Sequence, residues 1–529
     1  MSRLLLSGGL LYDGSGGSPF PADILIEDDR ILQVEPAGKT VFPGIEVKDL
    51  TGLSVSPGWI DPHAHSDASL LAAPEAFGKI SQGITTEISG NCGLSAFPIL
   101  TDEVREHLRI LYASYDIRPE WTDFRSYAAA LTARQPAVNT VFLCGHNTLR
   151  ANIAGYRQRE LSVSQLSAMD ALLDETLSQG ARGLSTGLLY TPGCFADETE
   201  LLTLLRTAAA HGGIYATHLR NEGDRLEEAV REAVFLAERS GITLQISHLK
   251  TALPRNWHKL GSVLSIIQSA QQRGVSIHAD RYPYTFSQTS LSIVLDQPYD
   301  KMTDRAIREV LQNDPAAYDR ALQQLKTSGR DWNRVILSRS EASAAAGLIG
   351  LTVADAAQKT GKTPQELVME ILREDAPGSL GAFGGMSEDN LKRILKQEWV
   401  CCGTDETARP TDDSLGLSHP RGFGSFPVFI RVLKKEGLPM EQIIRKITSL
   451  PAGIFQLSDR GMIRPGKNAD LVIFQEEELD SPADFRSPHR PASGIRTVYV
   501  NGKAAYDGLS HQVTARAGKV AGTAEPMKK

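Results

Sequence analysis

The chain has 529 residues, 41% hydrophobic and 22% charged, with 46 glycines and 27 prolines, a composition typical of a soluble globular protein and unlike a fibrous or disordered one. The formal net charge is −7 and no dense cluster of Lys and Arg occurs, so we do not expect a nucleic acid partner. The amino terminus lacks a secretory apolar region and no stretch approaches the roughly 20 apolar residues that span a bilayer, so we expect a cytoplasmic protein without a membrane partner.

The two ends of the chain resemble each other. Residues 1–54 have the pattern of short strands broken by Gly, Asp and Pro, and residues 455–512 repeat it, with Asn501-Gly502 as a tight-turn signal. We therefore predict one small β-sandwich domain formed from both termini. The small and polar residues 513–529 predict a flexible tail.

Between these ends, short β-rich runs alternate with helical patterns such as residues 163–180 and 224–241. The predicted strands lie within residues 58–65, 85–89, 139–147, 183–187, 214–218, 244–248, 275–284 and 399–405. Eight alternating units predict an α/β fold of the (β/α)8 TIM-like barrel type over residues 55–454, with an insertion at about 300–398 that could lie over the barrel mouth. A doubly wound open sheet is the structural alternative.

Several metal-binding residue types follow the predicted strands. His63 and His65 are one residue apart after the first strand. This pair alone is a weak signal of a metal site, since two polar residues at the end of a strand explain it equally well. The others are Cys92 after the second strand and His218, His248 and Asp405 at the ends of later strands. In a barrel the carboxyl ends of the strands form one ring, so we expect these six side chains to converge.

Imidazole, thiolate and carboxylate together suit Zn2+, and a zinc-activated water would serve the hydrolysis of a C–N or C–O bond. Asp405 could then act as the base that takes the proton from that water. The five cysteines are an odd number at irregular spacings, so we do not expect a disulfide framework.

The motifs "PGWIDPHAHSD", "SQGITTEISGNCG", "GHNTLR", "GIYATHLRNEG", "ISHLK", "DRYPYT", "GTDE" and "NADLVIF" resemble, in order, those of the D-aminoacylase (N-acyl-D-amino-acid deacylase) family of the amidohydrolase superfamily. The resemblance covers nearly the whole chain. It implies a (β/α)8 barrel with a small β-sandwich, and zinc-dependent hydrolysis of N-acyl-D-amino acids to a carboxylate and a free D-amino acid.

The resemblance also implies roles for particular residues. Cys92, His218 and His248 would hold the tightly bound zinc, while His63 and His65 would form a second, weaker position together with Cys92. Asp405 would be the catalytic base and proton shuttle, with Thr404 where many relatives have serine.

For the substrate, the resemblance implies that Lys250 binds the α-carboxylate and that Tyr282 hydrogen-bonds the scissile carbonyl as it becomes an oxyanion. Tyr284 could do the work of Tyr282, and Lys250 could instead be a solvated lysine after a strand. Arg281 departs from the small residue of some relatives and could alter the pocket. His146, Arg150, Arg220 and Glu222 could orient ligands or serve structure alone; we read His278 as a core histidine and His258, His419, His489 and His511 as surface or loop residues.

Two other functions stay open from the sequence. One is another amidohydrolase reaction, on a cyclic amide or a dipeptide, because neither a fold nor a metal ring determines the substrate. The other is a catalytically inactive barrel that serves as an assembly scaffold, which would predict lost ligands. The side-chain and acyl preferences, the number of metal ions and the oligomeric state are not determined by the sequence.

Overall fold

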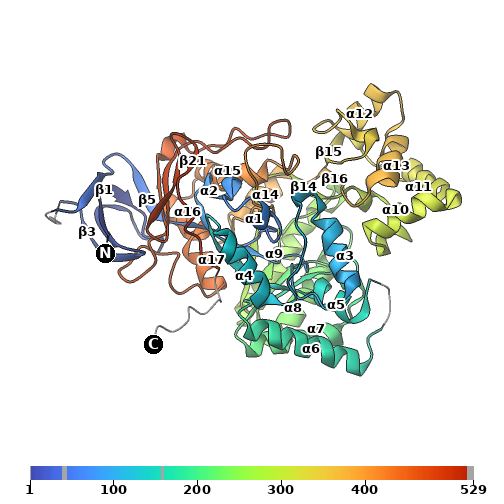
Figure 1. Ribbon diagram of the computed structural model, residues 1–529, viewed down its shortest axis with the longest axis horizontal. Helices are drawn as coiled ribbons and strands as arrows, with labels where there is room; N and C mark the ends of the chain where they lie inside the picture. The colour runs from blue at the N-terminus through green and yellow to red at the C-terminus, as the bar shows by residue number, and fades with distance from the viewer. Residues whose placement is uncertain (1, 39–43, 157–159, 521–529) are drawn as a thin grey trace.

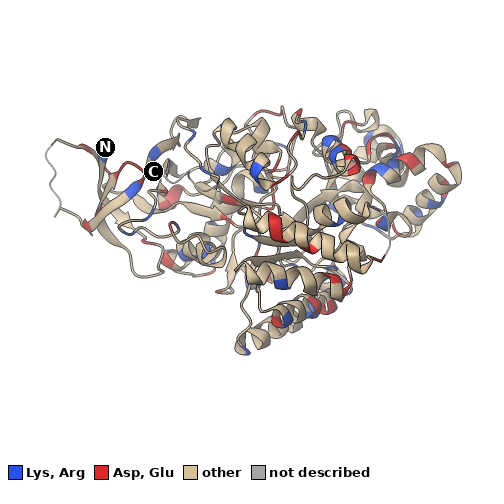
Figure 2. Ribbon diagram, turned by 60° about the horizontal axis from the view of Figure 1, so that its bottom comes forward, with Lys and Arg blue, Asp and Glu red and all other residues tan. Residues whose placement is uncertain are grey.

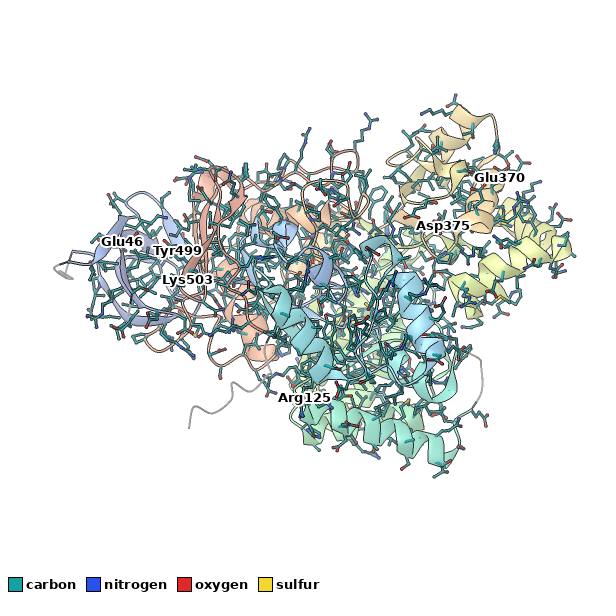
Figure 3. All side chains as sticks on the ribbon, viewed as in Figure 1. Glu46, Arg125, Glu370, Asp375, Tyr499 and Lys503 are labelled. Atoms are coloured by element: carbon teal, nitrogen blue, oxygen red, sulfur yellow. The ribbon has the colours of Figure 1, made fainter. Side chains whose placement is uncertain are left out.

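The computed structural model describes residues 2–38, 44–156 and 160–520. Figure 1 shows three parts along the long axis: a β-sheet at one end, a ring of strands and helices in the middle, and a helical lobe at the other end. Figure 3 places Glu46, Tyr499 and Lys503 in the first part and Glu370 and Asp375 in the last.

The middle part is a parallel barrel. Its strands are β6 (Trp59–Asp61), β7 (Ile84–Ser89), β8 (Asn139–Phe142), β9 (Cys144–Gly145), β10 (Gly183–Gly187), β11 (Ile214–His218), β12 (Thr243–Ile246), β13 (Ile277–Asp280) and β17 (Val400–Cys401). Each pairs in parallel with its neighbour in two sheets, β6-β7-β8 and β17-β13-β12-β11-β10-β9.

The two sheets join at both edges. Only Leu143 separates β8 from β9, and its N–H donates to Ser89 O at 2.9 Å. At the other edge a parallel bridge pairs Ala64 with Glu406, just beyond β6 and β17. The predicted (β/α)8 barrel is therefore confirmed, and the open-sheet alternative was wrong.

Helices surround the barrel and shield its apolar strands. Ser162 caps the predicted helix at 163–180, and Gly241, with a φ of 73°, ends the one at 224–241. Figure 2 shows acidic and basic residues interspersed along these outer helices. They are α1 (Ser69–Ala72), α2 (Phe77–Ile80), α3 (Asp102–Leu111), α4 (Phe124–Arg134), α5 (His146–Ala154), α6 (Val163–Ser178), α7 (Glu198–Ala210), α8 (Leu226–Ser240), α9 (Leu260–Gln272), α14 (Glu388–Leu395), α15 (Arg421–Lys435), α16 (Met440–Ile447) and α17 (Ser449–Ile454).

Strands from both ends of the chain form one nine-stranded sheet. Antiparallel pairing of β5 with β18 joins the two ends, with Val55 opposite Ile473, and Asn501-Gly502 makes the turn from β19 to β20. The strands are β1 (Arg3–Leu11), β2 (Phe20–Glu27), β3 (Arg30–Pro36), β4 (Glu46–Asp49), β5 (Ser54–Pro57), β18 (Leu471–Phe474), β19 (Ile495–Val500), β20 (Lys503–Asp507) and β21 (Gln512–Val513). The domain boundaries predicted at residues 54 and 455 stay a prediction.

The helical lobe between β13 and β17 has its own apolar core, which includes Leu337, Leu367 and Leu372. Its elements are β14 (Phe286–Ser290), β15 (Val335–Arg339), β16 (Leu380–Gly384), α10 (Asp304–Asn313), α11 (Pro315–Thr327), α12 (Val353–Thr360) and α13 (Pro364–Asp375). The sheet of this lobe begins at Phe286, earlier than the predicted insertion start near residue 300.

The end of the chain packs further than expected. Beyond β21, the carbonyl of Lys519 accepts from Thr140 N–H at 2.9 Å, and Val520 is buried. The tail predicted for 513–529 therefore has a packed first part, and residues 521–529 lie outside the described residues. Among the helices in the described part of the chain, none is both long and apolar enough to cross a bilayer.

Candidate metal centre

Six side chains that the sequence places at strand ends come together at the carboxyl end of the barrel. They form two groups, and within each group the possible ligand atoms all lie within 4.8 Å of one another. One group holds Cys92, His218 and His248, and the other holds His63, His65, Cys92 and Asp405. Cys92 belongs to both groups, so its sulfur lies between two candidate metal positions.

The backbone at this centre adopts an unusual conformation. Cys92, His248 and Asp405 have φ values of 52°, 38° and 52°, in the left-handed region that costs energy for residues with a side chain. Close packing holds the first of these turns: a Cβ on Gly187 would lie 2.1 Å from the Cys92 carbonyl oxygen. Three strand ends are thus turned to aim these side chains at one point.

Cys92 is surrounded by imidazoles. Its Sγ lies 3.3 Å from His63 Nε2 and 3.6 Å from His248 Nε2. Burial would raise the pKa of this thiol, but the charge of His63 and the neighbouring imidazoles of His218 and His248 hold it well below its usual range. The thiolate, which is the form that binds metals, is therefore favoured.

Two carboxylates, the buried Asp280 and the half-buried Glu222, lie beside two of the histidines. His63 Nδ1 lies 3.0 Å from Asp280 Oδ1, and His248 Nδ1 lies 3.0 Å from a Glu222 oxygen. In both cases the Nε2 atom is left facing Cys92. For His63 this carboxylate–histidine arrangement is typical of zinc ligands, because it sets the tautomer and raises the basicity of the coordinating nitrogen. The Nδ1 atom of His248 is shared between Glu222 and Lys250.

His218 supplies an independent indication of a metal. Both of its ring nitrogens are buried, and neither has a hydrogen-bond partner among residues 2–38, 44–156 and 160–520. A buried polar atom without a partner is costly, and a metal ion would give one of these nitrogens its partner. The donor set of thiolate, imidazoles and carboxylate matches zinc.

Asp405 lies between the metal group and a buried arginine. Its Oδ1 is 3.1 Å from His65 Nε2, and its Oδ2 accepts from Arg421 Nη1 at 2.8 Å. Burial would raise the pKa of this carboxyl, but Arg421, followed by the nearby histidines, holds it well below its usual value. Thr404 beside it donates to Asp61 Oδ2 at 2.6 Å and so anchors the loop.

Lys250 and Tyr282 both lie buried near this centre. Lys250 Nζ hydrogen-bonds Glu222 and lies 2.7 Å from His248 Nδ1. The Tyr282 hydroxyl has no hydrogen-bond partner within the described residues. Burial would raise the pKa of Tyr282, but Arg281, Lys250 and Arg421 together lower it.

Other residues singled out in the sequence lie apart from this centre. His146 Nε2 and Arg150 Nε lie 2.8 and 3.0 Å from Glu200, and Arg220 Nε lies 3.0 Å from Glu232. His419 and His489 lie in loops, in agreement with the reading as surface or loop residues, but both are buried rather than at the surface; His419 Nδ1 accepts from the Arg421 N–H at 3.0 Å.

Sequence reasoning missed Asp280 and Arg421 and left Glu222 undecided. Asp280 and Arg421 stand in "DRYPY" and "HPR", next to residues that drew attention for other reasons. Neither has a spacing that marks it as a partner of a histidine or of Asp405. Asp280 is the last residue of β13, and that place at a strand end was its signal, whereas Arg421 begins α15 and carried none.

Comparisons with known proteins agree with this geometry. The model of a family described as the amidohydrolase family matches residues 46–506. The chain is 33% identical to a D-aminoacylase of Alcaligenes xylosoxydans xylosoxydans, over 94% of this chain and 93% of the relative. It is 32% identical to the N-acyl-D-glutamate deacylase of the same organism, over 95% of this chain and 93% of the relative.

A solved structure is similar along the whole chain. It is the N-acyl-D-glutamate deacylase of Bordetella bronchiseptica, complexed with zinc and a phosphonate inhibitor that mimics the tetrahedral intermediate of its reaction. It is 30% identical, with a TM-score of 0.81, and the match covers 98% of this chain and 99% of that one.

Proposed function

The chain belongs to the amidohydrolase family, and on that premise we propose that it is a metal-dependent hydrolase that cleaves N-acyl-D-amino acids to a carboxylate and a free D-amino acid. The observation that carries the proposal is the thiolate of Cys92 shared between two groups of metal-binding side chains. The relatives with deacylase names support the reaction and its D-amino acid substrates.

We assign the tightly bound zinc to Cys92, His218 and His248, and a second, weaker position to His63, His65 and Cys92. The unpartnered nitrogens of His218 support the first assignment. The weaker rank of the second rests on His65, which is only half-buried and already lies 3.1 Å from Asp405. When bound, zinc acts as a Lewis acid that activates water and polarises the amide carbonyl.

Asp405 moves the proton. As a carboxylate it accepts the proton of the attacking water, and it then donates that proton to the nitrogen of the leaving amine. Arg421 holds Oδ2 at 2.8 Å, which leaves Oδ1 directed at the histidines and at the reacting groups. The lowered pKa of Asp405 keeps its carboxyl ionised at neutral pH, and therefore ready to act as a base.

Tyr282 donates its hydroxyl hydrogen to the carbonyl oxygen as negative charge develops there. Its buried hydroxyl is free to donate within the described structure, and the cations that lower its pKa make it a stronger donor. Burial raises the pKa of the alternative, Tyr284, which makes it a weaker donor. The ammonium of Lys250 attracts the α-carboxylate of the substrate.

The test is a substrate panel on the zinc-loaded protein: N-acetyl-D- and N-acetyl-L-amino acids, dipeptides and hydantoins. We expect turnover of the N-acetyl-D-amino acids and loss of that turnover in Asp405→Ala. Turnover confined to L-forms, dipeptides or rings would favour the other amidohydrolase reactions. A zinc content near zero in protein purified without chelator would favour the inactive scaffold.

A further inference from the structure

Arg281 is a buried cation without a counterion. It follows β13 directly, and only 1% of its surface is exposed. Its Nη2 donates to the Tyr284 carbonyl at 2.7 Å and contacts Met386 Sδ at 2.9 Å. Within the described residues, neither Nε nor Nη1 has a hydrogen-bond partner, and no carboxylate lies within 4.0 Å.

The other buried arginines of the described structure are different. Arg150 contacts Glu200 at 3.0 Å, Arg409 contacts Glu406 at 3.8 Å and Arg421 contacts Asp405 at 2.8 Å. Lys250 and Arg421, the other two cations close to Tyr282, are both paired, Lys250 with Glu222. Since a buried charge is costly unless it is paired, Arg281 is the one of these cations that still needs an anion.

The position of Arg281 indicates where that anion would come from. Its guanidinium carbon lies 3.9 Å from the centre of the Tyr282 ring, and Tyr282 is the residue proposed to meet the scissile carbonyl. Tyr284 and Met386 flank β14 and β16, where the sheet of the helical lobe meets the barrel. The unpaired guanidinium therefore lies beside the site of reaction, on the side of that lobe.

We propose that Arg281 binds the side-chain carboxylate of an acidic D-amino acid, so that the preferred substrates are N-acyl derivatives of D-glutamate or D-aspartate. This inference rests on the proposed function. All N-acyl-amino acids carry an α-carboxylate, which the proposed function assigns to Lys250. A second anionic group on the substrate would supply the partner that Arg281 lacks in the protein.

The first test compares the zinc-loaded wild type with Arg281→Met and Arg281→Lys on two matched substrates, N-acetyl-D-glutamate and the neutral N-acetyl-D-glutamine. We expect the wild type to prefer the glutamate derivative. Arg281→Met should lower kcat/KM for it by about 10- to 100-fold, the size of a lost hydrogen bond to a charged group, mainly through KM. The glutamine derivative should be nearly unaffected, and Arg281→Lys should fall between.

Arg305→Met is the matched control, because Arg305 is exposed on α10 and pairs with Glu309 on the same helix. This control variant should leave kcat/KM unchanged for both substrates. N-acetyl-D-aspartate and N-acetyl-D-asparagine, as a second pair, show which acidic chain length fits.

The second test is thermal unfolding. Arg281→Met removes an unpaired buried charge, so without ligand its Tm should equal or exceed that of the wild type. D-glutamate, the expected product, should raise the Tm of the wild type but not of the variant.

Three results would overturn the inference: a wild type that prefers N-acetyl-D-glutamine, equal losses on both substrates in Arg281→Met, or a lowered Tm in that variant, which would make Arg281 a structural residue. In each of these cases turnover of neutral N-acetyl-D-amino acids would leave the proposed function standing. No turnover of any N-acetyl-D-amino acid would refute the proposed function itself.

Discussion

The carboxylates of Asp280 and Glu222, which lie beside His63 and His248, allow the two proposed metal positions to be weakened separately. Asp280→Asn removes the charge behind His63, and Glu222→Gln removes the charge behind His248. Asp280 also accepts from Gln245 Nε2 at 2.9 Å, and the Oε1 atom of that glutamine has no hydrogen-bond partner in the described structure. Gln245 can therefore turn its amide to accept from the new asparagine, so the fold should tolerate the change.

The expected magnitude follows from these contacts. Loss of an outer carboxylate typically weakens metal binding about 10- to 100-fold, which corresponds to about 1.4 to 2.7 kcal/mol. Asp280 contacts the ring of His63 but only the backbone N–H of His248, at 2.8 Å. Asp280→Asn should therefore weaken the second zinc position by this amount and leave the first nearly unchanged, whereas Glu222→Gln should weaken the first.

The assay is competition between the protein and a chromogenic chelator, which resolves two zinc affinities, together with the zinc content by atomic emission. Asp174→Asn is the control, because Asp174 forms an Asp–His pair with His211 at 2.8 Å on the surface. The control should keep both affinities. Equal weakening of both affinities in Asp280→Asn, or no change in either, would refute the assignment of His63 to a separate second position. Weakening of the tighter affinity alone would refute the ranking of the two positions.

Three further changes test other parts of the site. Asp405→Asn should keep the zinc content but lower kcat by about 10²- to 10⁴-fold, as expected for a lost proton-transfer group, and unchanged turnover would contradict its role. Gly187→Ala would put a Cβ 2.1 Å from the Cys92 carbonyl oxygen and so displace Cys92, which should lower the zinc content. Full zinc content would show that the loop around Cys92 accommodates the extra methyl group. Burial, aided by Arg445, lowers the pKa of His278 to about 4, so the unfolded chain, with a histidine pKa near 6.5, binds the proton more readily. The stability from this neutral histidine is present above pH 6.5 and is lost as the pH falls towards 4. Between pH 7 and 5, the free energy of unfolding of His278→Gln, measured in urea, should therefore fall by about 1–2 kcal/mol less than that of the wild type. Equal losses would contradict the lowered pKa.

Much of the architecture could be predicted from the sequence, because each barrel strand is a short local pattern. Residues 183–187 and 214–218 are strands in the structure over the full predicted ranges. Parallel strands linked by helices place their carboxyl ends on one side of a barrel. That rule is why His218 and His248, 30 positions apart in sequence, could be expected near Cys92.

The tertiary structure alone decided how these side chains are held. His63 and Asp280 are 217 positions apart, and no local pattern pairs them. The left-handed turns at Cys92 and Asp405 depend on packing between neighbouring loops, and the missing counterion of Arg281 depends on what the helical lobe brings beside it. The types of chemical group and their order along the chain are local properties that a sequence carries. Their pairing, charge balance and aim are long-range properties, because they depend on contacts between strand ends and loops that meet only in the folded protein.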